Sequence, residues 1–407
     1  MKCHHCGNTS FIRFADLGTA PLSNAMLAKE RLDEPEAYYP LIVDVCDDCF
    51  LAQVVEQKSA AEIFNSDYSY FSSYSRSWLE HAEQFAAMAA VRFGLDERSQ
   101  VVEIASNDGY LLQYFQARGI PVTGVEPTAN TAAVAAAKGI PTIVDFFGLQ
   151  LAEERLSGSA DLIVGNNVFA HVPDINDFSA GLKAALKPGG VISLEFPHLL
   201  RLIEQAQFDT IYHEHFSYLS LWTAERILST AALKVFDVEQ LPTHGGSLRV
   251  FAAHALDETK SRSTAVDAVL AEEAAAGLRG RDVYEGFQPR IDRIRAGFLE
   301  FLREQRSAGA KVVGYGAAAK GNTLLNYCGI KGNEMIRFVA DLNPHKQGRY
   351  LPGSHIPVVA PERIEEQKPD FIVIFPWNLR EEIIDQLADA RAWGARFVTA
   401  IPELRIL

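Results

Sequence analysis

The chain has 407 residues, of which 48% are hydrophobic and 22% charged, so it can bury two or three cores and should form more than one domain. Its net charge of -14 argues against a nucleic-acid partner, because no basic stripe is present to neutralise phosphates. No apolar run approaches the roughly 18 to 20 residues of a membrane-spanning helix, and Met1-Lys2-Cys3 begins no signal peptide. We therefore expect a soluble, cytoplasmic, multidomain enzyme that acts on small molecules without a membrane partner.

Four of the five cysteines form two Cys-x-x-Cys pairs near the amino terminus, Cys3 with Cys6 and Cys46 with Cys49. Each pair places two thiolates on one tight turn, an arrangement that favours tetrahedral coordination of zinc. Disulfides are disfavoured in a reducing compartment, and unliganded cysteines are the remaining alternative. We predict a structural zinc whose closed ligand shell stabilises a domain too short to build its own core.

A series of βα units begins at residue 101. Residues 101–112 predict a buried strand, a tight turn and a helix start, and 123–126 a second strand that ends in a carboxylate able to accept hydrogen bonds from a ribose diol. Ala105 and Asn107 stand where a dinucleotide fingerprint has glycines, which argues against a pyrophosphate over the turn, although Asn tolerates a left-handed conformation. Three interpretations of this turn remain: a dinucleotide site, an S-adenosylmethionine site and an ordinary βα corner without a ligand.

Three more strands extend the series. Residues 141–144 lead to an acidic and an aromatic residue that could hold an adenine, 160–167 end in Asn-Asn, and 186–195 predict a helix end, a turn and a fifth strand. Carboxyl ends of parallel strands form the ligand-binding edge of an α/β sheet. The candidate cofactor-binding residues at this edge are Glu103, Ala105, Ser106, Asn107, Gly109, Tyr110, Glu126, Pro127, Asp145, Phe146, Asn166 and Asn167.

The densest group of reactive side chains follows the fifth strand, in residues 208–218. Tyr212, Glu214 and His215 supply a general base, a group that can polarise it and a phenol that can donate to an oxyanion. A metal site built from His213, Glu214 and His215 is one alternative, and a structural turn is another. The acid–base reading is favoured, because this segment returns to the edge of the sheet where the cofactor is expected.

The carboxyl-terminal part predicts a second α/β sheet. Residues 241–250 predict either a simple hairpin or a loop whose His244, Ser247 and Arg249 line a cleft, and 257–306 predict connecting helices. Residues 311–323 then predict a strand, a glycine turn and a helix start without a Walker loop. A diphosphate-binding lobe is preferred to an inert pseudo-repeat. Its candidate substrate-binding residues are Tyr315, Gly316, Lys320, Asn322, Asp341 and Lys346, together with Arg249.

Several motifs resemble known families. The acidic strand ends, Asn-Asn and Lys-Pro-Gly-Gly resemble the class I S-adenosylmethionine-dependent methyltransferases. The paired zinc knuckles, the Glu-x-Ala-Ser-Asn-Asp-Gly-Tyr-Leu-Leu run at 103–112, Tyr-His-Glu-His-Phe-Ser-Tyr at 212–218 and Gly-Tyr-Gly-Ala-Ala-Ala-Lys-Gly-Asn-Thr at 314–323 are similar to the nucleotide-diphosphate-sugar C-3 methyltransferases of deoxysugar pathways. This resemblance covers essentially the whole chain.

The resemblance implies an α/β protein in three parts. These are a zinc-binding domain at 1–75, a class I methyltransferase domain with a Rossmann-like sheet at 76–240, and a second Rossmann-like domain for the nucleotide sugar at 241–407. With both sheets in one chain, a monomer is expected. The implied cofactor is S-adenosylmethionine, and the implied substrate is a 4-keto-6-deoxy sugar on thymidine diphosphate or a related nucleotide.

The resemblance also suggests roles for single residues. A functional tyrosine is expected in the aromatic segment 64–75, with Tyr70 as the candidate, and His171 is expected near the transferred methyl. In our hypothesis His215 takes the C3 proton, Glu214 orients or tunes it, and Tyr212 or His171 stabilises the enolate oxygen. The alternatives are O- or N-methylation of a small molecule, or a sugar-nucleotide binding protein with a vestigial methyltransferase core.

Overall fold

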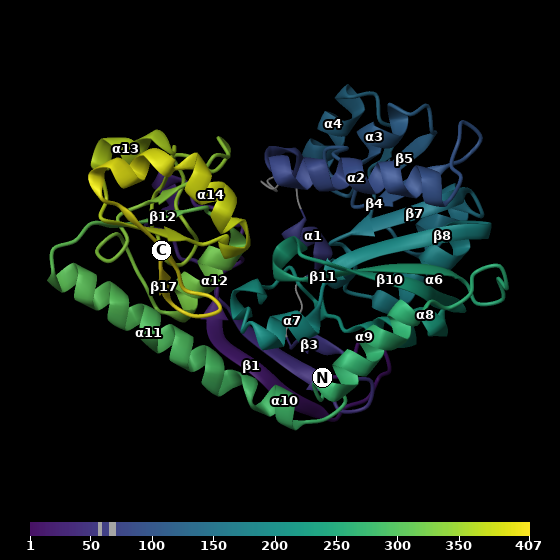
Figure 1. Ribbon diagram of the computed structural model, residues 1–407, viewed down its shortest axis with the longest axis horizontal. Coiled ribbons are helices and arrows are strands. Elements are labelled where there is room, and N and C mark those ends of the chain that lie inside the picture. Colours follow the sequence, from purple (N-terminus) through teal and green to yellow (C-terminus); the bar gives the residue numbers. More distant parts are fainter. Residues whose placement is uncertain (56–58, 65–70) are drawn as a thin grey trace.

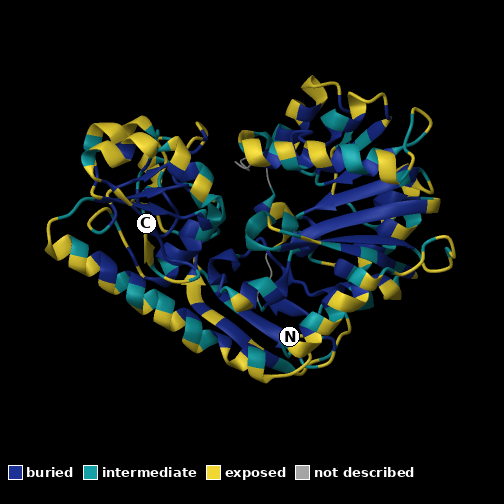
Figure 2. Ribbon diagram, in the orientation of Figure 1, coloured by how far each residue is buried: buried dark blue, intermediate teal, exposed yellow. Residues whose placement is uncertain are grey.

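A computed structural model describes residues 1–55, 59–64 and 71–407 of the chain. The described residues form three β-sheets, of four, seven and six strands. Figure 1 shows the seven-stranded and six-stranded sheets in two separate lobes, with the amino-terminal strands lying below and between them. Figure 2 shows that the strands are mostly buried, whereas exposed residues gather on the outer faces of the helices.

The seven-stranded sheet has the order β10-β11-β8-β7-β4-β5-β6. Strands β6, β5, β4, β7 and β8 are parallel, and β11 is antiparallel to both of its neighbours. Helices cover both faces, which is why its central strands β4 and β7 are almost wholly buried. The strands are β4 (Val101–Ile104), β5 (Val122–Val125), β6 (Thr142–Ile143), β7 (Ala160–Asn166), β8 (Leu186–Pro197), β10 (Leu233–Leu241) and β11 (Ser247–His254).

Helix α2 (Arg76–Arg92) packs on one face of this sheet, and α6 (Ile175–Ala185) and α8 (Leu221–Thr230) pack on the other. Trp78 and Phe85 of α2 reach one core, while Phe178 of α6 and Ala224 of α8 reach the opposite core. Shorter helices complete the lobe: α3 (Leu112–Gln116), α4 (Ala129–Ala137), α5 (Leu149–Leu151) and α7 (Leu199–Glu204).

Two features of this sheet were not expected from the sequence. The domain boundary expected between residues 240 and 241 falls at a hairpin, because β11 lies between β10 and β8, so the sheet continues to His254. The helix end and turn expected from residue 186 are instead the start of β8, which pairs with β7 from Leu186. Local turn residues do not reveal which strand a segment will pair with.

The six-stranded sheet has the order β14-β13-β12-β15-β16-β17, parallel except for the last strand. The strand expected at 335–340 is reduced to its last two residues. The strands are β12 (Val312–Tyr315), β13 (Val339–Ala340), β14 (Val358–Val359), β15 (Phe371–Ile374), β16 (Arg396–Thr399) and β17 (Arg405–Ile406), and the helices are α12 (Ala319–Tyr327), α13 (Glu362–Gln367) and α14 (Arg380–Gln386).

The amino-terminal sheet joins the two lobes. Its strands β1 (Phe11–Ala20), β2 (Tyr39–Cys46) and β3 (Ala52–Val54) are antiparallel, and β3 also pairs with β9 (Ser217–Tyr218), directly after the Tyr-His-Glu-His run. Apolar residues of this sheet share a core with the helices of the carboxyl-terminal lobe, whereas the cysteine turns pack against the core of the seven-stranded sheet. Helix α1 (Ala60–Ile63) follows β3.

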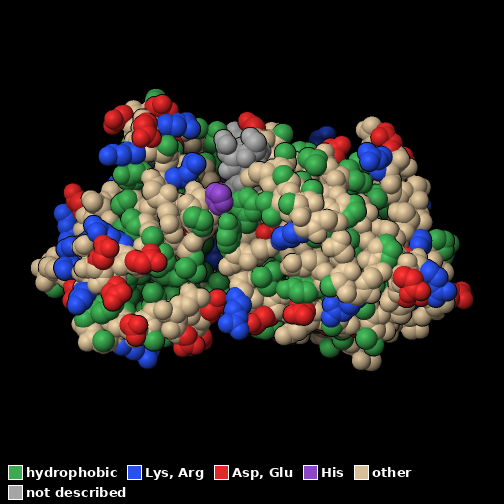
Figure 3. Space-filling model, turned by 90° about the horizontal axis from the view of Figure 1, so that it is seen from above, with side chains coloured by type: hydrophobic (Ala, Val, Ile, Leu, Met, Phe, Trp, Pro, Cys, Tyr) green, Lys and Arg blue, Asp and Glu red, His purple; other side chains and the backbone are tan. Residues whose placement is uncertain are grey.

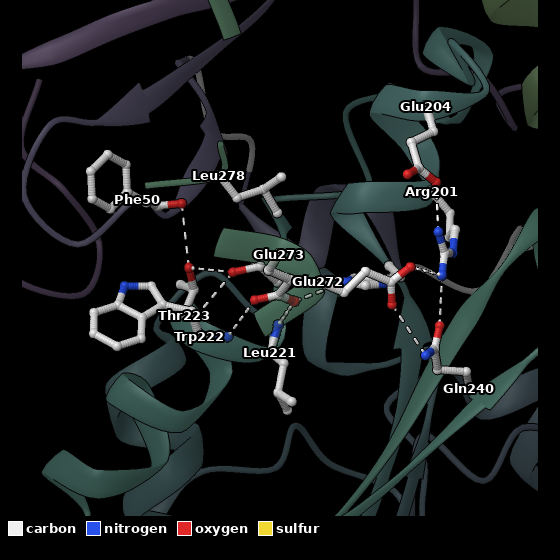
Figure 4. A network of polar contacts seen from close by, with 12 residues as sticks. Phe50, Arg201, Glu204, Leu221, Trp222, Thr223, Gln240, Glu272, Glu273 and Leu278 are labelled. Carbon is white, nitrogen blue, oxygen red and sulfur yellow. Dashed lines mark hydrogen bonds and ion pairs between the residues drawn. The ribbon is translucent and has the colours of Figure 1, made fainter. Parts of the chain in front are cut away.

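Helices α9 (Thr264–Ala275), α10 (Asp282–Glu285) and α11 (Phe287–Ser307) run from the seven-stranded to the six-stranded sheet (Figure 1). Figure 4 shows how α9 is attached. The buried Glu273 carboxylate accepts hydrogen bonds from the backbone amides of Leu221 and Trp222, at 2.6 and 3.0 Å, and lies 2.8 Å from His198 Nε2. A carboxylate is well placed at the positive amino end of α8, so Glu273 fixes the start of the connector.

In the described part of the chain, no helix is both long and apolar enough to cross a membrane. Figure 3 shows the face seen from above, where acidic and basic side chains are interspersed on the outer parts of both lobes. Hydrophobic side chains appear near the line where the lobes meet, which is where the cavity described next lies.

Candidate active site

A cavity of about 840 Å³ lies between the two lobes. It is lined by the carboxyl ends of the parallel strands of the seven-stranded sheet, by the segment after β8 and by loops of the carboxyl-terminal lobe. The sequence-predicted residues that line it are Ala105, Asn107, Tyr110, Glu126, Pro127, Asp145, Phe146, Asn166, Asn167, His171, Tyr212, Glu214, His215, Lys320 and Lys346. Residues far apart in the sequence therefore share one chamber.

The turn after β4 is held in a left-handed backbone conformation. Ala105, Asn107 and Gly109 have φ of 56°, 49° and 76°. Glu126 at the end of β5 accepts hydrogen bonds from the backbone amides of Asn107, at 2.9 Å, and Thr128, at 2.8 Å. Its carboxylate thus supports the turn while facing the cavity.

Three predicted cofactor residues lie behind the turn and do not line the cavity. Glu103 is fully buried, and burial raises its pKa well above the usual range, against the opposing effect of the Tyr110 hydroxyl. Ser106 is buried against Gly124, and Gly109 packs on Ile140. In the structure these residues shape the turn from below.

The cavity fits S-adenosylmethionine on the methyltransferase side. The amide oxygen and nitrogen of Asn166 and the amide oxygen of Asn167 are buried without hydrogen bonds to the described residues. Buried polar atoms are normally paired, so a polar ligand is expected here. Asp145 and Phe146 stand further along the same edge, after β6. When bound, this cofactor supplies an electrophilic methyl group.

His215 lies at the centre of the reactive cluster. Its Nδ1 is 2.8 Å from the backbone carbonyl of Thr210, which fixes the proton on Nδ1 and leaves the Nε2 lone pair available. The centroid of its ring lies 4.0 Å from the ring centroid of Tyr212 and 4.6 Å from that of His171. Burial lowers the pKa of His215 well below its usual value and that of His171 to about 4, so both imidazoles are neutral at pH 7.

Glu214 is held by a residue that the sequence did not indicate. Asn24 Nδ2 lies 2.7 and 2.9 Å from the two carboxylate oxygens of Glu214. Burial raises the pKa of Glu214 to about 7, although Asn24 and the charge of Lys346 oppose this shift. Among the described residues, Glu214 and His215 share no side-chain hydrogen bond, so Thr210 orients the imidazole. Asn24 carries no local signal, because it is 190 residues from its partner.

The carboxyl-terminal lobe contributes two lysines to the cavity. Lys320 Nζ donates to Asn378 Oδ1 at 3.0 Å and lies 4.6 Å from the Trp377 ring. Burial lowers the pKa of Lys320, while nearby Asp209 raises it. Lys346 is also largely buried, and its Nζ donates to the Ala317 carbonyl at 2.9 Å.

The other predicted substrate residues are not in the cavity lining. Tyr315 bonds Gln386 at 3.1 Å, Gly316 packs on Pro376, and Asp341 accepts the amides of Ala317 and Asn343. Asn322 is buried. Arg249 lies in a buried cluster, where its Nη2 is 2.8 Å from Glu195 Oε2.

A short segment connects the cofactor turn to the other lobe; we call residues 71–75 the strap. The Ser72 amide donates to Asn107 Oδ1 at 2.9 Å. On its other side, the Phe71 ring stacks on His345 of the carboxyl-terminal lobe, with centroids 5.4 Å apart, and Tyr74 lies 6.4 Å from the same ring. The predicted Tyr70 lies outside the described residues.

The two cysteine pairs meet in a separate site. The sulfurs of Cys3, Cys6, Cys46 and Cys49 all lie within 4.8 Å of one another, with Cys3 to Cys49 at 3.4 Å and Cys6 to Cys46 at 3.5 Å. These separations exceed the roughly 2.05 Å of a disulfide and are near the roughly 3.8 Å between sulfurs that each lie about 2.3 Å from a tetrahedral zinc. The cluster fits zinc, which would hold the amino-terminal turns without an open catalytic position.

Comparison with known proteins shows which family the chain belongs to. Family models match in order: a zinc binding domain at residues 3–64, a methyltransferase domain at 78–238 and a C-methyltransferase C-terminal domain at 242–402. The C-methyltransferase NovU of Streptomyces niveus is 37% identical over 408 residues, covering 100% of this chain and 96% of that protein. The chain belongs to the C-methyltransferase family. The predicted family, α/β fold class, S-adenosylmethionine cofactor and zinc are confirmed.

Two solved structures illustrate a similarity that covers less than half of the chain. The PH0226 protein of Pyrococcus horikoshii is 14% identical with a TM-score of 0.38, over 49% of this chain and 100% of that one. Magnesium protoporphyrin IX methyltransferase of Synechocystis is 14% identical with a TM-score of 0.34, over 43% and 79%. The assignment rests on the family models and the full-length relative.

Proposed function

We propose that this C-methyltransferase methylates C3 of a nucleoside-diphosphate 4-keto-6-deoxy sugar, with thymidine diphosphate as the first nucleotide to test, in deoxysugar biosynthesis. The observation that supports the proposal is that one cavity contains the cofactor turn, the Tyr212 to His215 cluster and two lysines of the other lobe. A substrate that fills it must offer an acidic C–H near His215 and an anionic group near Lys320 and Lys346.

The lysines favour an anionic substrate. In a chain of net charge -14, an anion will not be drawn in by the overall field, so local cations must hold it. Lys346 is buried and Lys320 is half-buried at the cavity, where an opposite charge is screened less than at the surface. A diphosphate would satisfy both ammonium groups.

The cluster supports chemistry through an enolate. A C–H bond is too weak a nucleophile to take up a methyl group, but a neighbouring ketone lets the carbon lose its proton as an enolate. His215 Nε2 accepts this proton, because Thr210 holds the imidazole in the required tautomer. Tyr212 and His171, which contact the same ring, are candidate stabilisers of the oxyanion.

Glu214 acts on this step through its charge. The carboxylate lies directly beside His215 in the sequence and faces the same cavity, so its negative charge favours the imidazolium that forms when the proton is taken. Asn24 holds this carboxylate in place.

The test is mass spectrometry of products formed from S-adenosylmethionine and a panel of thymidine-diphosphate 4-keto-6-deoxy sugars in heavy water. We expect the mass of a methyl group to be added in the product and solvent deuterium to appear at C3 of the sugar that has not been methylated. His215→Asn should lose both reactions. Full turnover by that variant, or methylation of a sugar that lacks the keto group, would contradict the enolate route and favour O- or N-methylation.

A further inference from the structure

The β10–β11 hairpin loop presents His244 to the cavity in a strained backbone conformation. His244 has φ of 54°, and Gly245 and Gly246 follow with φ of 89° and 118°. A left-handed conformation costs a residue with a Cβ roughly 1 kcal/mol. Strained non-glycine residues are concentrated at functional sites, which is a reason to ask what this imidazole does.

The loop is fixed on both sides. Thr243 Oγ1 donates to Glu195 Oε1 at 2.9 Å, and the same buried carboxylate also binds His81 and Arg249, each at 2.8 Å. On the other side Gly245 packs so closely on the indole of the carboxyl-terminal lobe that a Cβ there would lie 2.3 Å from Trp377. The imidazole is therefore presented by a rigid support, as a catalytic group requires.

The hydrogen bonding of His244 defines its proton. Asn167 Nδ2 lies 2.9 Å from His244 Nε2, so the amide donates and the imidazole proton is on Nδ1. Nδ1 makes no hydrogen bond to the residues that the structure describes, and the ring lines the cavity beside Trp78, at 5.1 Å between centroids. Burial lowers the pKa of His244 to about 4, with Lys320 adding to the effect, so the group is a neutral donor.

His244 and His215 serve one reaction centre. Both line the same cavity, and they are close enough for the charge of one to influence the other. His244 touches Asn167 at the end of β7, on the cofactor side, and lies near Lys320 on the substrate side. A base and an oxyanion donor must both reach the same ketone, since the carbonyl is bonded to the carbon that loses its proton.

We infer that His244 is a further catalytic residue, whose Nδ1–H donates a hydrogen bond to the keto oxygen of the sugar. This inference rests on the proposed function. As His215 Nε2 takes the C3 proton, the C–H electron pair forms the C3–C4 double bond and the carbonyl pair moves onto oxygen, where His244 stabilises it. C3 then bonds to the methyl carbon as the methyl–sulfur bond breaks, the pair of that bond stays on sulfur as S-adenosylhomocysteine leaves, and the carbonyl is restored. A neutral imidazole suits this role, because it donates without giving up its proton.

The test compares two histidines whose backbone is in the left-handed conformation. His244→Gly removes the donor and relieves the backbone strain, and His355→Gly does the same at φ of 56° outside the cavity, where the side chain pairs with Glu36. We expect His244→Gly to keep its Tm but to lose about 100-fold in kcat, with KM changed less than about threefold. Its rate of deuterium exchange at C3 with S-adenosylhomocysteine bound should fall in parallel, and added imidazole should restore part of kcat. His355→Gly should retain full kcat.

Other outcomes would overturn the inference. The inference fails if the His244→Gly enzyme keeps at least half of the wild-type kcat, or if only its KM changes. It also fails if the affinity for S-adenosylmethionine falls by the same factor as kcat, or if a fall in Tm accounts for the lost activity. Wild-type enzyme that leaves every keto sugar unchanged would overturn the proposed function as well. The wild-type reaction thus separates failure of His244 from failure of the substrate assignment.

Discussion

Ala105 and Asn107 show that the cofactor turn keeps its left-handed geometry although two of its positions are not glycine. Asn tolerates this region through its short polar side chain, whereas Ala bears the full steric cost. A left-handed Asn107 could be expected from the sequence, whereas Ala105 carries no such signal, because strain of this kind depends on the tertiary structure that enforces it. Glu126, which binds the Asn107 amide, is one such constraint.

Gly109 offers a matched comparison with Gly119. Their φ values are 76° and 74°, so alanine costs each site roughly 1 kcal/mol of backbone strain. A Cβ at Gly109 would lie 2.3 Å from Ile140 Cδ1, whereas nothing lies within 4 Å at Gly119. We expect Gly109→Ala to unfold about 1–3 kcal/mol more easily than Gly119→Ala in urea and to bind S-adenosylmethionine more weakly. Equal stabilities would show that Ile140 moves aside at no cost.

We expect the protonation of Glu214 to set the acidic limb of the pH dependence of kcat/KM. Because its pKa is about 7, its charge and therefore kcat/KM should rise between pH 6 and 8. Asn24→Ala removes hydrogen bonds to the charged form, raises the pKa further and should move the limb to higher pH by about one unit or more. Glu214→Gln should abolish the limb, and an unshifted limb in Asn24→Ala would assign it to another group.

The same carboxyl affects stability with a defined sign. Its pKa in the folded protein lies above the ordinary value of 4.5, so the folded state binds the proton more tightly than the unfolded state. This contribution to folding is fully present below pH 4.5 and is lost as the pH rises through about 7. Wild-type protein should therefore lose more stability over this interval than Glu214→Gln.

At the level of elements, the attachment of α9 to α8 depends on Glu273 and not on its neighbour Glu272. Glu273→Ala leaves two backbone amides and His198 without their buried acceptor, at a cost of about 3 kcal/mol or more. Glu272 is partly exposed and pairs with Arg201 at 2.6 Å, so Glu272→Ala should cost about 1 kcal/mol at most. Urea unfolding of the two variants checks this difference, and similar values would refute the anchoring role.

Elements were predictable where their signal is local. The helix expected at 76–93 is α2 (Arg76–Arg92), and the strands expected from 101, 160 and 311 begin at Val101, Ala160 and Val312. Pairings between distant segments were not predictable. Strand β9 joins the amino-terminal sheet, β11 enters the methyltransferase sheet, and Asn24 reaches Glu214, all through contacts that no local pattern encodes.

For the whole molecule, the zinc site predicts a long-range effect on activity. The cysteine turns pack on the methyltransferase core, and His5 bonds Asn176 of α6 at 2.8 Å. Strand β3 of the same domain pairs with β9, next to His215. We expect Cys46→Ser to lose zinc, lower Tm and reduce activity, whereas Cys328→Ser, at a buried cysteine outside the cluster, should retain zinc. Metal analysis, thermal unfolding and turnover test this, and a stable, active, zinc-free Cys46→Ser protein would contradict it.

We expect the strap to make the two ligand sites thermodynamically dependent on each other. Asn107, part of the cofactor turn, holds one side of it, and His345 of the opposite lobe stacks on the other. A ligand that favours this arrangement lowers the free energy that the second ligand must spend to form it. Linkage requires each ligand to change the affinity for the other by the same factor. S-adenosylhomocysteine should therefore increase the affinity for thymidine diphosphate by the same factor by which thymidine diphosphate increases the affinity for S-adenosylhomocysteine. His345→Ala should bring this factor close to one. Calorimetric titration in both orders measures it; unchanged cooperativity in the variant would mean that the lobes communicate elsewhere. Through five residues, each lobe would bind its ligand more tightly once the other lobe is occupied.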